Sequence, residues 1–219
     1  TIVVTDSKGC TNSDTETVVD PGAITIDSVI TTNPSCNLSC NGTIHVYAVG
    51  GTGALGYTLT KPVGAPVTNA TGIFNSLCAG TYTVSAHDAN CNVTATVVIT
   101  DPPALSWSVA TSTNISCAGS ANGSISTTAT GGTGIIEYSK DGATFFPSGN
   151  FSLLLAGTYT ITAKDANGCT LTTSFTIVEP PVLTLSAPVV TNVTCAGAND
   201  GTITTVAGGG TPGYTYSIA

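Results

Sequence analysis

The strongest constraint on what this chain can fold into is an internal repeat of about 80 residues. A Gly-Gly-Thr motif begins at Gly50, Gly131 and Gly209, at spacings of 81 and 78 residues. Other motifs return in the same order. They are Ala-Gly-Thr-Tyr-Thr from Ala79 and Ala156, Asp-Ala-Asn from Asp88 and Asp165 with a related turn at Asp6, and Asp/Glu-Pro-Pro from Asp101 and Glu179. A recurring period of this length indicates that each period is one structural unit stacked in series.

The repeat divides the 219 residues into four expected domains. Segment 1–22 is the C-terminal part of a repeat, 23–103 and 104–181 are complete repeats, and 182–219 is the N-terminal part of another. We therefore expect the natural molecule to continue in both directions. The junction at Asp101-Pro102-Pro103 should end one sheet and stiffen the connection, because proline fixes φ and cannot donate to a strand ladder.

Within a repeat, apolar residues alternate with Thr and Ser, which is the pattern of half-buried strands. In the first complete repeat we expect strands over 24–35, 43–49, 57–60, 73–77, 81–87 and 92–100, with a variable Pro-containing stretch at 61–72. Only 7% of the residues are charged, too few for the wet faces of surface helices. The sequence thus predicts an all-β chain of tandem Ig-like antiparallel β-sandwich repeats of about 80 residues. Tyr82 and Tyr159 follow tight turns as tyrosine corners do.

The charge balance excludes several partners. The net charge is −8, and the four basic residues are all lysine. A chain this poor in positive charge lacks the footprint that nucleic-acid phosphates require, and anionic membrane surfaces are disfavoured for the same reason. No apolar run approaches the roughly 18 to 20 residues that span a bilayer, so we expect no membrane insertion.

No group of residues predicts catalysis, a cofactor or a metal site, and we expect a protein that is not an enzyme. His45 and His87 alternate with core positions on the outer face of strands, without a nucleophile beside either. Asp6, Asp88 and Asp165 open turns, where Asp is favoured because its carboxylate bonds the local backbone. A partial cation site is the alternative, but calcium needs six to eight oxygens. The Gly-Gly-Thr motif has no following lysine, which excludes a phosphate loop.

Eight cysteines without metal-site spacing indicate disulfides and an oxidising, extracellular compartment. Cys40 and Cys78 both occur in the first complete repeat, where the second has Ala121 and Leu155. Because they are gained together and fall at the same end of an Ig-like sandwich, we expect them to pair.

The other six cysteines leave three pairings open. Bonds within a repeat, Cys36–Cys91 and Cys117–Cys169, would join opposite ends of a sandwich, about 26 Å apart, although a disulfide needs Cα atoms within about 7 Å. Bonds across the linker would use every cysteine at a constant spacing, as Cys10–Cys36, Cys91–Cys117 and Cys169–Cys195, but would require the linker to fold back. Head-to-tail stacking would instead join Cys36 to Cys169. We favour this last pairing, which leaves the partners of Cys10, Cys91, Cys117 and Cys195 undecided.

The motif Cys195-Ala196-Gly197-Ala198-Asn199-Asp200-Gly201-Thr202-Ile203, followed by Gly209-Gly210-Thr211-Pro212-Gly213-Tyr214, resembles the SprB repeat of gliding-motility adhesins from Bacteroidota. The second repeat matches it at 117–125 and 131–133, and the remaining motifs are similar to the second half of such repeats and to PKD-like domains. The resemblance extends over nearly the whole chain. It implies a long surface protein that is exported by type IX secretion and contacts substrata. Asp27-Ser28-Val29 is similar to the O-glycosylation motif of these bacteria, which makes Ser28 a candidate site. The Asn-x-Ser/Thr sequons, such as those at Asn69 and Asn150, reflect composition.

Three functions remain to be compared. We favour a structural stalk of an extracellular, cell-surface adhesin whose partners are the neighbouring repeats. A glycan- or ligand-binding module, with surface polysaccharide as its partner, is the first alternative, although Trp107, near the junction, is better explained by linker packing. A self-assembling filament subunit that lends a strand to its neighbour is the second.

Overall fold

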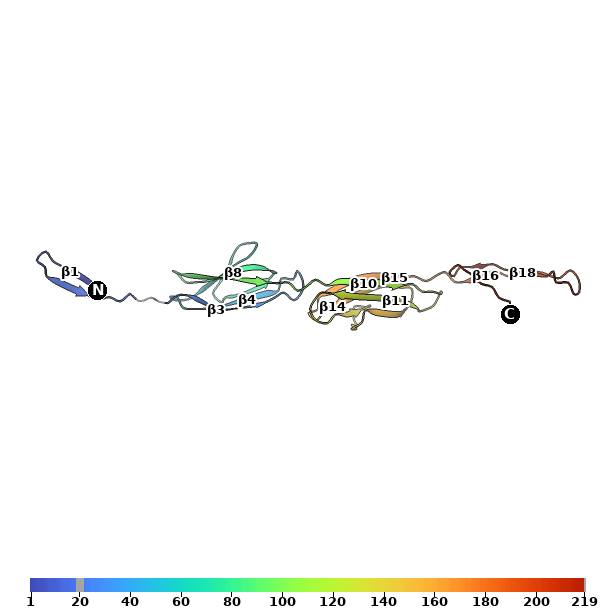
Figure 1. Cartoon of the computed structure of the whole chain (residues 1–219), viewed down its shortest axis with the longest axis horizontal. Helices are drawn as coiled ribbons and strands as arrows, with labels where there is room; N and C mark the ends of the chain where they lie inside the picture. Colours follow the sequence, from blue (N-terminus) through green and yellow to red (C-terminus); the bar gives the residue numbers. More distant parts are fainter. Residues whose placement is uncertain (19–21, 219) are drawn as a thin grey trace. The chain divides into compact units, whose positions relative to one another are not determined.

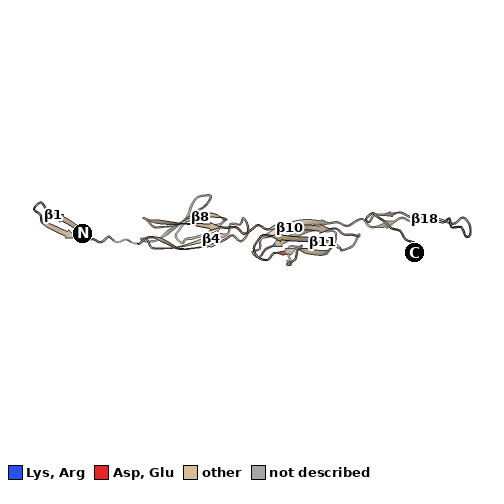
Figure 2. Ribbon diagram, in the orientation of Figure 1, with Lys and Arg blue, Asp and Glu red and all other residues tan. Residues whose placement is uncertain are grey.

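The structure is a computed structural model that describes residues 1–18 and 22–218. Within these residues the regular elements are all strands, and they form small antiparallel sheets (Figure 1). The chain divides into two compact units, Thr1–Asp101 and Pro102–Ala219. Among the described residues there is no helix of the length and apolarity that crossing a membrane requires. Figure 2 shows how sparse the charged residues are along the ribbon.

Repeat one, which we define as residues 23–103, is a sandwich of two sheets. One sheet has the order β3-β4-β7, formed by Thr25–Thr32, Gly42–Val49 and Ile73–Leu77. The other has the order β6-β5-β8-β9, formed by Val67–Asn69, Gly56–Thr60, Gly80–His87 and Asn92–Ile99. Seven antiparallel strands in two sheets, with the chain crossing between the sheets after β4, after β6 and after β7, form an Ig-like sandwich. The predicted fold class is therefore confirmed.

The core of repeat one lies between these sheets and follows from period-two alternation. In β4, Ile44 and Val46 are buried while the intervening side chains reach the surface. Strand β8 alternates in the same way through Tyr82, Val84 and Ala86. Because successive side chains point to opposite faces of a sheet, this alternation fixes which face of each strand is apolar and thereby the register.

Repeat two, residues 104–181, is built on the same plan. One sheet has the order β10-β11-β13, from Ser106–Thr113, Gly123–Thr130 and Asn150–Leu154. The other has the order β12-β14-β15, from Glu137–Ser139, Gly157–Lys164 and Thr170–Ile177. The edge strand β6 has no counterpart here, where an isolated bridge joins Tyr138 to Phe146. Ile161, Ala163 and Ile177 lie in a separate core cluster.

The outer segments form small ladders only. Near the N-terminus, β1 (Ile2–Thr5) pairs with β2 (Thr11–Asp14) as a hairpin. In the last segment, β16 (Thr184–Leu185) pairs with β19 (Ala207–Gly208), and β17 (Val189–Thr191) with β18 (Thr202–Thr204). Counted from the preceding cysteine, Asn12 corresponds to Val93 and Leu171 of the complete repeats, and Asp14 to Ala95 and Thr173. In this hairpin both Asn12 and Asp14 are exposed.

Two details of repeat one differ from the sequence expectation. The stretch 61–72, expected to be a variable loop, contains the edge strand β6, which pairs with β5 through Tyr57 and Asn69. The first strand is shorter than 24–35, because it ends at Thr32 before Asn33 and Pro34. Proline has no N–H to donate and disfavours regular continuation at the preceding residue.

Both predicted tyrosine corners are present. The Tyr82 hydroxyl donates to the carbonyl oxygen of Cys78 at 2.8 Å, and the Tyr159 hydroxyl donates to that of Leu155 at 3.1 Å. Each bond closes the turn that precedes the second-last strand of its repeat.

Candidate functional site

The recurring motifs gather at the two ends of each sandwich. We call the end at which the chain enters a repeat the leading end, and the end at which it leaves the trailing end. The Gly-Gly-Thr and Asp-Ala-Asn turns lie at the leading end. The cysteine loop after the first strand and the Asp/Glu-Pro-Pro segment lie at the trailing end.

At the leading end of repeat one, the Asp88 carboxylate joins two turns. Its Oδ2 accepts from the backbone N of Thr52 at 2.8 Å and from the Thr52 hydroxyl at 3.2 Å. Its Oδ1 accepts from the backbone N of Asn90 at 2.9 Å and of Cys91 at 2.8 Å. These donors, the Thr52 amide foremost, hold the pKa of Asp88 well below its ordinary value, because each stabilises the ionised form.

Repeat two reproduces this arrangement at Asp165, which is buried. Its Oδ2 accepts from the backbone N of Thr133 at 2.8 Å, and its Oδ1 accepts from those of Asn167 at 3.0 Å and Cys169 at 2.9 Å. The turn contains Gly168 at φ +83°, which suits a three-residue hairpin loop with a left-handed last position. Repeat one lacks this glycine, and its shorter turn closes through a bond from the Asp88 amide to the Cys91 carbonyl at 3.0 Å.

The diglycine beside each aspartate is required by space as well as by φ. A Cβ on Gly51 would lie 2.8 Å from Asp88 Oδ2, and one on Gly132 would lie 2.8 Å from Asp165 Oδ2. The N–H of Gly132 donates to the carbonyl of Pro103 at 2.8 Å, which ties the leading end of repeat two to the incoming chain. Because its glycines have no Cβ, the Gly-Gly-Thr motif lets the carboxylate approach the backbone closely.

At the trailing end, the loop after the first strand is tied to the outgoing chain. Asn33 Oδ1 accepts from the Thr100 amide and Asn33 Nδ2 donates to the Thr100 hydroxyl, both at 3.0 Å. The Leu38 amide donates to Asp101 Oδ2 at 3.0 Å. In repeat two, the Val178 amide donates to Asn114 at 3.1 Å and the Gly119 amide donates to Glu179 at 2.9 Å.

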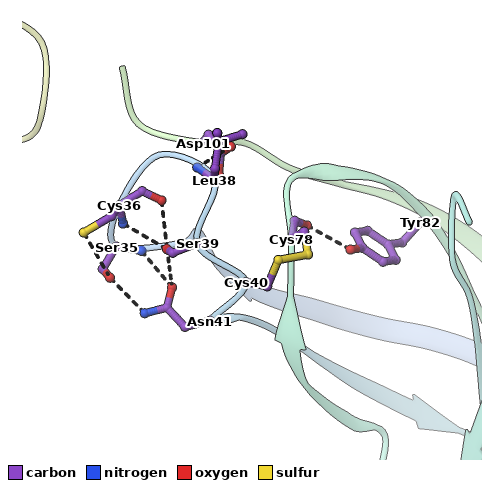
Figure 3. Close-up of a disulfide and its surroundings, with 9 residues drawn as sticks. All are labelled: Ser35, Cys36, Leu38, Ser39, Cys40, Asn41, Cys78, Tyr82 and Asp101. Atoms are coloured by element: carbon purple, nitrogen blue, oxygen red, sulfur yellow. Dashed lines mark hydrogen bonds between the residues drawn. A yellow bond between two sulfur atoms is a disulfide. The ribbon is translucent and has the colours of Figure 1, made fainter. Parts of the chain in front are cut away.

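A disulfide between Cys40 and Cys78 closes the trailing end of repeat one (Figure 3). It follows the last register pair of strands β4 and β7, Gly42 with Leu77. Cys78 also accepts the tyrosine-corner bond from Tyr82, so the disulfide and the corner share one residue. The pair lies where the sequence places it, at one end of the sandwich.

The remaining cysteines alternate between the ends. In repeat one, Cys36 lies in the trailing-end loop, two residues before Leu38, and Cys91 lies in the leading-end turn. In repeat two, Cys117 takes the trailing position and Cys169 the leading one. Cys10, Cys91, Cys117 and Cys195 are exposed thiols in the structure. The pairing of Cys36 stays a prediction.

The histidines are accommodated by local contacts. His45 stacks on Tyr47 with ring centroids 4.0 Å apart, and His87 Nε2 lies 3.3 Å from the Thr58 hydroxyl. Across residues 1–18 and 22–218, no three His, Cys, Asp or Glu side chains are grouped as metal ligands would be. The Asp88 oxygens, offered above as a partial cation site, are already engaged by four N–H and O–H donors.

Two other residues singled out in the sequence take different places. Ser28 is exposed in β3 beside a β-bulge between Ile26 and Ser28, and its glycosylation stays a prediction. Trp107 was expected to pack against the linker, but the structure places it elsewhere. It packs against the core of repeat two, with its ring centroid 6.4 Å from that of Tyr138, because it stands in β10 opposite the buried Ala129.

The structure also reveals residues that the sequence reasoning missed. Asn33 and Asn114 connect the first and last strands of each repeat, and Asp101 and Glu179 hold the cysteine loop. A signal was available in the recurrence of Asn-x-Ser/Thr-Cys, which begins at Asn33, Asn114 and Asn192. Its regular place before each trailing-end cysteine indicates that the asparagine has a role in the fold of the repeat.

The sequence matches no curated relative. Among solved structures, it is similar to a C-terminal fragment of intimin in complex with the translocated intimin receptor domain (TM-score 0.41, 16% identity, 74% of this chain and 66% of that one). It is also similar to the N-terminal eight Ig domains of Down syndrome cell adhesion molecule (0.38, 13%, 71% and 24%) and to the S-layer protein rSbsC (0.29, 14%, 83% and 36%). The chain thus spans less than two thirds of each of these structures.

The model of one family, the SprB repeat, matches residues 109–144 and 187–219, about a third of the chain. Both segments run from the first strand through the cysteine loop of the trailing end to the diglycine of the leading end. The corresponding stretch of repeat one is not matched, and there Leu38 and Cys40 stand where repeat two has Gly119 and Ala121. The match is narrower than the resemblance drawn from the motifs, but it names the same family: these two segments of the chain match the SprB repeat.

Proposed function

We propose that this chain is a segment of a structural stalk in a large secreted cell-surface adhesin, and that it catalyses no reaction. The observation that carries the proposal is the recurrence of one end structure in tandem. Asp88 and Asp165 make equivalent bonds at the leading ends, and Asp101 and Glu179 do so at the trailing ends. A chain in which the bonds at the repeat ends recur along with the cores is suited to act as a spacer, as a stalk does.

The surface chemistry supports this role. The exposed faces of the sheets carry mostly Thr and Ser hydroxyls, as in β15, where exposed Thr170, Thr172, Ser174 and Thr176 alternate with inward residues. Such a surface is hydrated without being strongly charged. We take the chain to be extracellular, since it contains a disulfide and segments that match the SprB repeat. Attachment to a cell surface, gliding motility and type IX secretion follow from the family resemblance and belong to the proposal.

The proposed domains are 1–22, 23–103, 104–181 and 182–219, and the proposed partners are neighbouring repeats. A ligand-binding module is the alternative with an observation behind it. A hollow of about 350 Å³ lies next to the disulfide, lined by Lys61, Pro62 and Tyr82 among others. A glycan array probed with the chain tests this alternative, and sedimentation velocity at increasing concentration tests the filament alternative.

The stalk itself is tested with arrays of two, four and eight copies of residues 23–181. The maximum dimension from small-angle X-ray scattering should grow in proportion to copy number, because stiff junctions add length linearly. In a matched array, Pro102 and Pro103 are replaced by glycine. The maximum dimension of that array should increase more nearly as the square root of copy number. A proline array that grows no faster than the glycine array would refute the stalk.

A further inference from the structure

The hollow beside the disulfide of repeat one lies at the open side of the sandwich. It has a volume of about 350 Å³, within the usual range of small-molecule sites, and is lined by residues 61–63, 76–79 and Tyr82. A second hollow of about 120 Å³ shares Lys61 and Leu77 with it and is lined further by residues of β6 and β7. These are the edge strands of the two sheets. We call the two adjoining hollows the side groove.

One wall of the side groove is the chain that follows β5. A Cβ on Gly80 would lie 2.8 Å from Pro62 Cγ, so Pro62 rests against this turn because residue 80 has no side chain. At the equivalent Gly157 of repeat two, such a Cβ would meet a ring carbon of Tyr159 at 3.9 Å and no other neighbour within 4 Å. The packing that forms this wall therefore belongs to repeat one.

The facing wall contains Cys78 and is held from two sides. The disulfide to Cys40 ties it to the segment before β4, and the Tyr82 hydroxyl bonds its carbonyl oxygen at 2.8 Å (Figure 3). In repeat two, Ala121 and Leu155 replace the two cysteines. A wall that is fixed before a ligand arrives lowers the entropy that is lost on binding.

The side groove contains a cation without a counter-charge. Lys61 lines both hollows and is the only lysine of repeat one, which has no arginine. Among the residues that the structure describes, Lys61 is in no ion pair, and the pair that is present joins Lys164 to Glu137 in repeat two. No carboxylate lines either hollow. Although the chain has a net charge of −8, the groove itself is therefore complementary to an anion.

The rest of the lining combines apolar and hydroxyl-binding groups. Pro62 and Val63 present apolar surface, and the Val63 side chain is 87% exposed. Asn75 and Ser76 are exposed on the β7 side, where an amide and a hydroxyl can each donate and accept hydrogen bonds. A sugar ring presents C–H faces and hydroxyls together, so a sugar that carries a carboxylate matches all three kinds of group.

An acidic peptide matches the groove less well. An extended peptide binds beside a sheet by adding a strand to its edge, which requires a regular row of free backbone groups. Strand β6 is three residues long, and in β7 Ser76 has φ +57°, which interrupts the extended backbone. The register between β4 and β7 also shifts between Gly42 and Ile44. Neither edge offers a ladder that a peptide could extend.

We propose that the side groove of repeat one binds an acidic oligosaccharide. The Lys61 ammonium donates to the carboxylate of a uronic acid unit, and the sugar rings lie against Pro62 and Val63. This inference does not depend on the stalk role, because a spacer can carry a sugar site on its side. Its failure is also distinguishable, since scattering from the arrays measures length and a titration measures binding.

The test is a titration of the full chain with the trimer of galacturonic acid, followed by ¹⁵N–¹H NMR. The amide signals of Lys61, Val63, Ser76 and Ala79 should shift saturably. The methyl ester of the same trimer keeps the sugar and removes the charge, and it should bind about tenfold more weakly. Absence of saturable shifts up to the solubility limit of the trimer would overturn the proposal, as would equal binding of the ester.

Three variants assign the charge to one residue. Lys61→Met keeps the length of the side chain and should weaken binding about tenfold, whereas Lys61→Arg should retain it. Lys140→Met removes an exposed lysine of repeat two and should change nothing, because it makes the same change in net charge away from the groove. Unchanged binding in Lys61→Met, or an equal loss in Lys140→Met, would contradict the proposal.

Two measurements on the unaltered chain complete the test. Raising the salt concentration should weaken binding of the trimer, because the contact is between charges at the surface, and binding that is insensitive to salt would refute it. A blocked peptide with three glutamates carries the same number of carboxylates as the trimer. It should bind more weakly than the trimer, and tighter binding would show that the groove is a peptide site instead.

Discussion

Replacing Cys40 and Cys78 by serine should lower the stability of repeat one and leave repeat two unchanged. The disulfide spans a sequence separation of 38 residues. Closing a loop of that length removes entropy from the unfolded chain worth about 4 kcal/mol at 25 °C. A repeat of about 80 residues unfolds with an entropy of roughly 170 cal/mol/K near its midpoint, so the midpoint of repeat one should fall by roughly 20 °C.

Differential scanning calorimetry measures both repeats in one experiment. The transition of repeat two is identified with an Ile161→Ala variant, because Ile161 is fully buried and its truncation typically costs 2–5 kcal/mol. A matched variant, Ala121→Cys with Leu155→Cys, introduces the same cysteine pair into repeat two. It should raise the midpoint temperature of the repeat-two transition alone.

The reasoning would be refuted if both transitions fell together, since the loop-closure effect belongs to one sandwich. A shift below about 5 °C would also refute it, because the unfolded chain would then gain little entropy from release of the loop.

Three further predictions concern the turns. Leu38 is exposed and has φ +60°, and Gly119 takes the same place in repeat two. Leu38→Gly should therefore stabilise repeat one by about 1 kcal/mol, measured by urea unfolding, because glycine adopts this φ without strain. A loss of stability would contradict this. The pKa of the Asp88 carboxyl is lower in the folded chain than in the unfolded one, so the ionised carboxylate stabilises the fold. This stabilisation is complete above about pH 5 and is lost as the pH falls below about 4. The melting temperature should therefore fall less steeply between pH 5 and pH 3 in Asp88→Asn than in the unaltered chain, and equal slopes would count against the carboxylate. Chelation of divalent ions should leave the melting temperature unchanged, since protein donors occupy the Asp88 oxygens, whereas a drop of several degrees would reveal a cation site.

Period-two alternation was sufficient to predict the sandwich. Ile44 and Val84 alternate with polar neighbours, and a strand offers only two faces, so the sequence determines which one is buried. The edge strand β6 escaped prediction because Val67–Asn69 is three residues long and mostly exposed. Its pairing depends on the neighbouring β5 and leaves no apolar pattern of its own.

The ends of the repeats were only partly predictable. Asp88 could be identified as a turn residue from its Asp-Ala-Asn context, but its bond to Thr52 crosses 36 residues of sequence. The contact between Asp101 and Leu38 spans 63 residues and follows from how the first and last strands meet. Local sequence reports local turn chemistry, whereas contacts between distant turns follow from the assembled sandwich.

The bonds that close each end of a repeat have a consequence for how such a chain can change over generations. Asp101 bonds a loop of repeat one, which precedes the junction, and Pro103 bonds a turn of repeat two, which follows it. A recombination event that duplicates or deletes one period, with its crossovers at the Asp/Glu-Pro-Pro junctions, therefore leaves each of these hydrogen bonds with an equivalent partner. The number of repeats can drift while every surviving copy keeps complete ends, so length is the property of this architecture that is most open to selection.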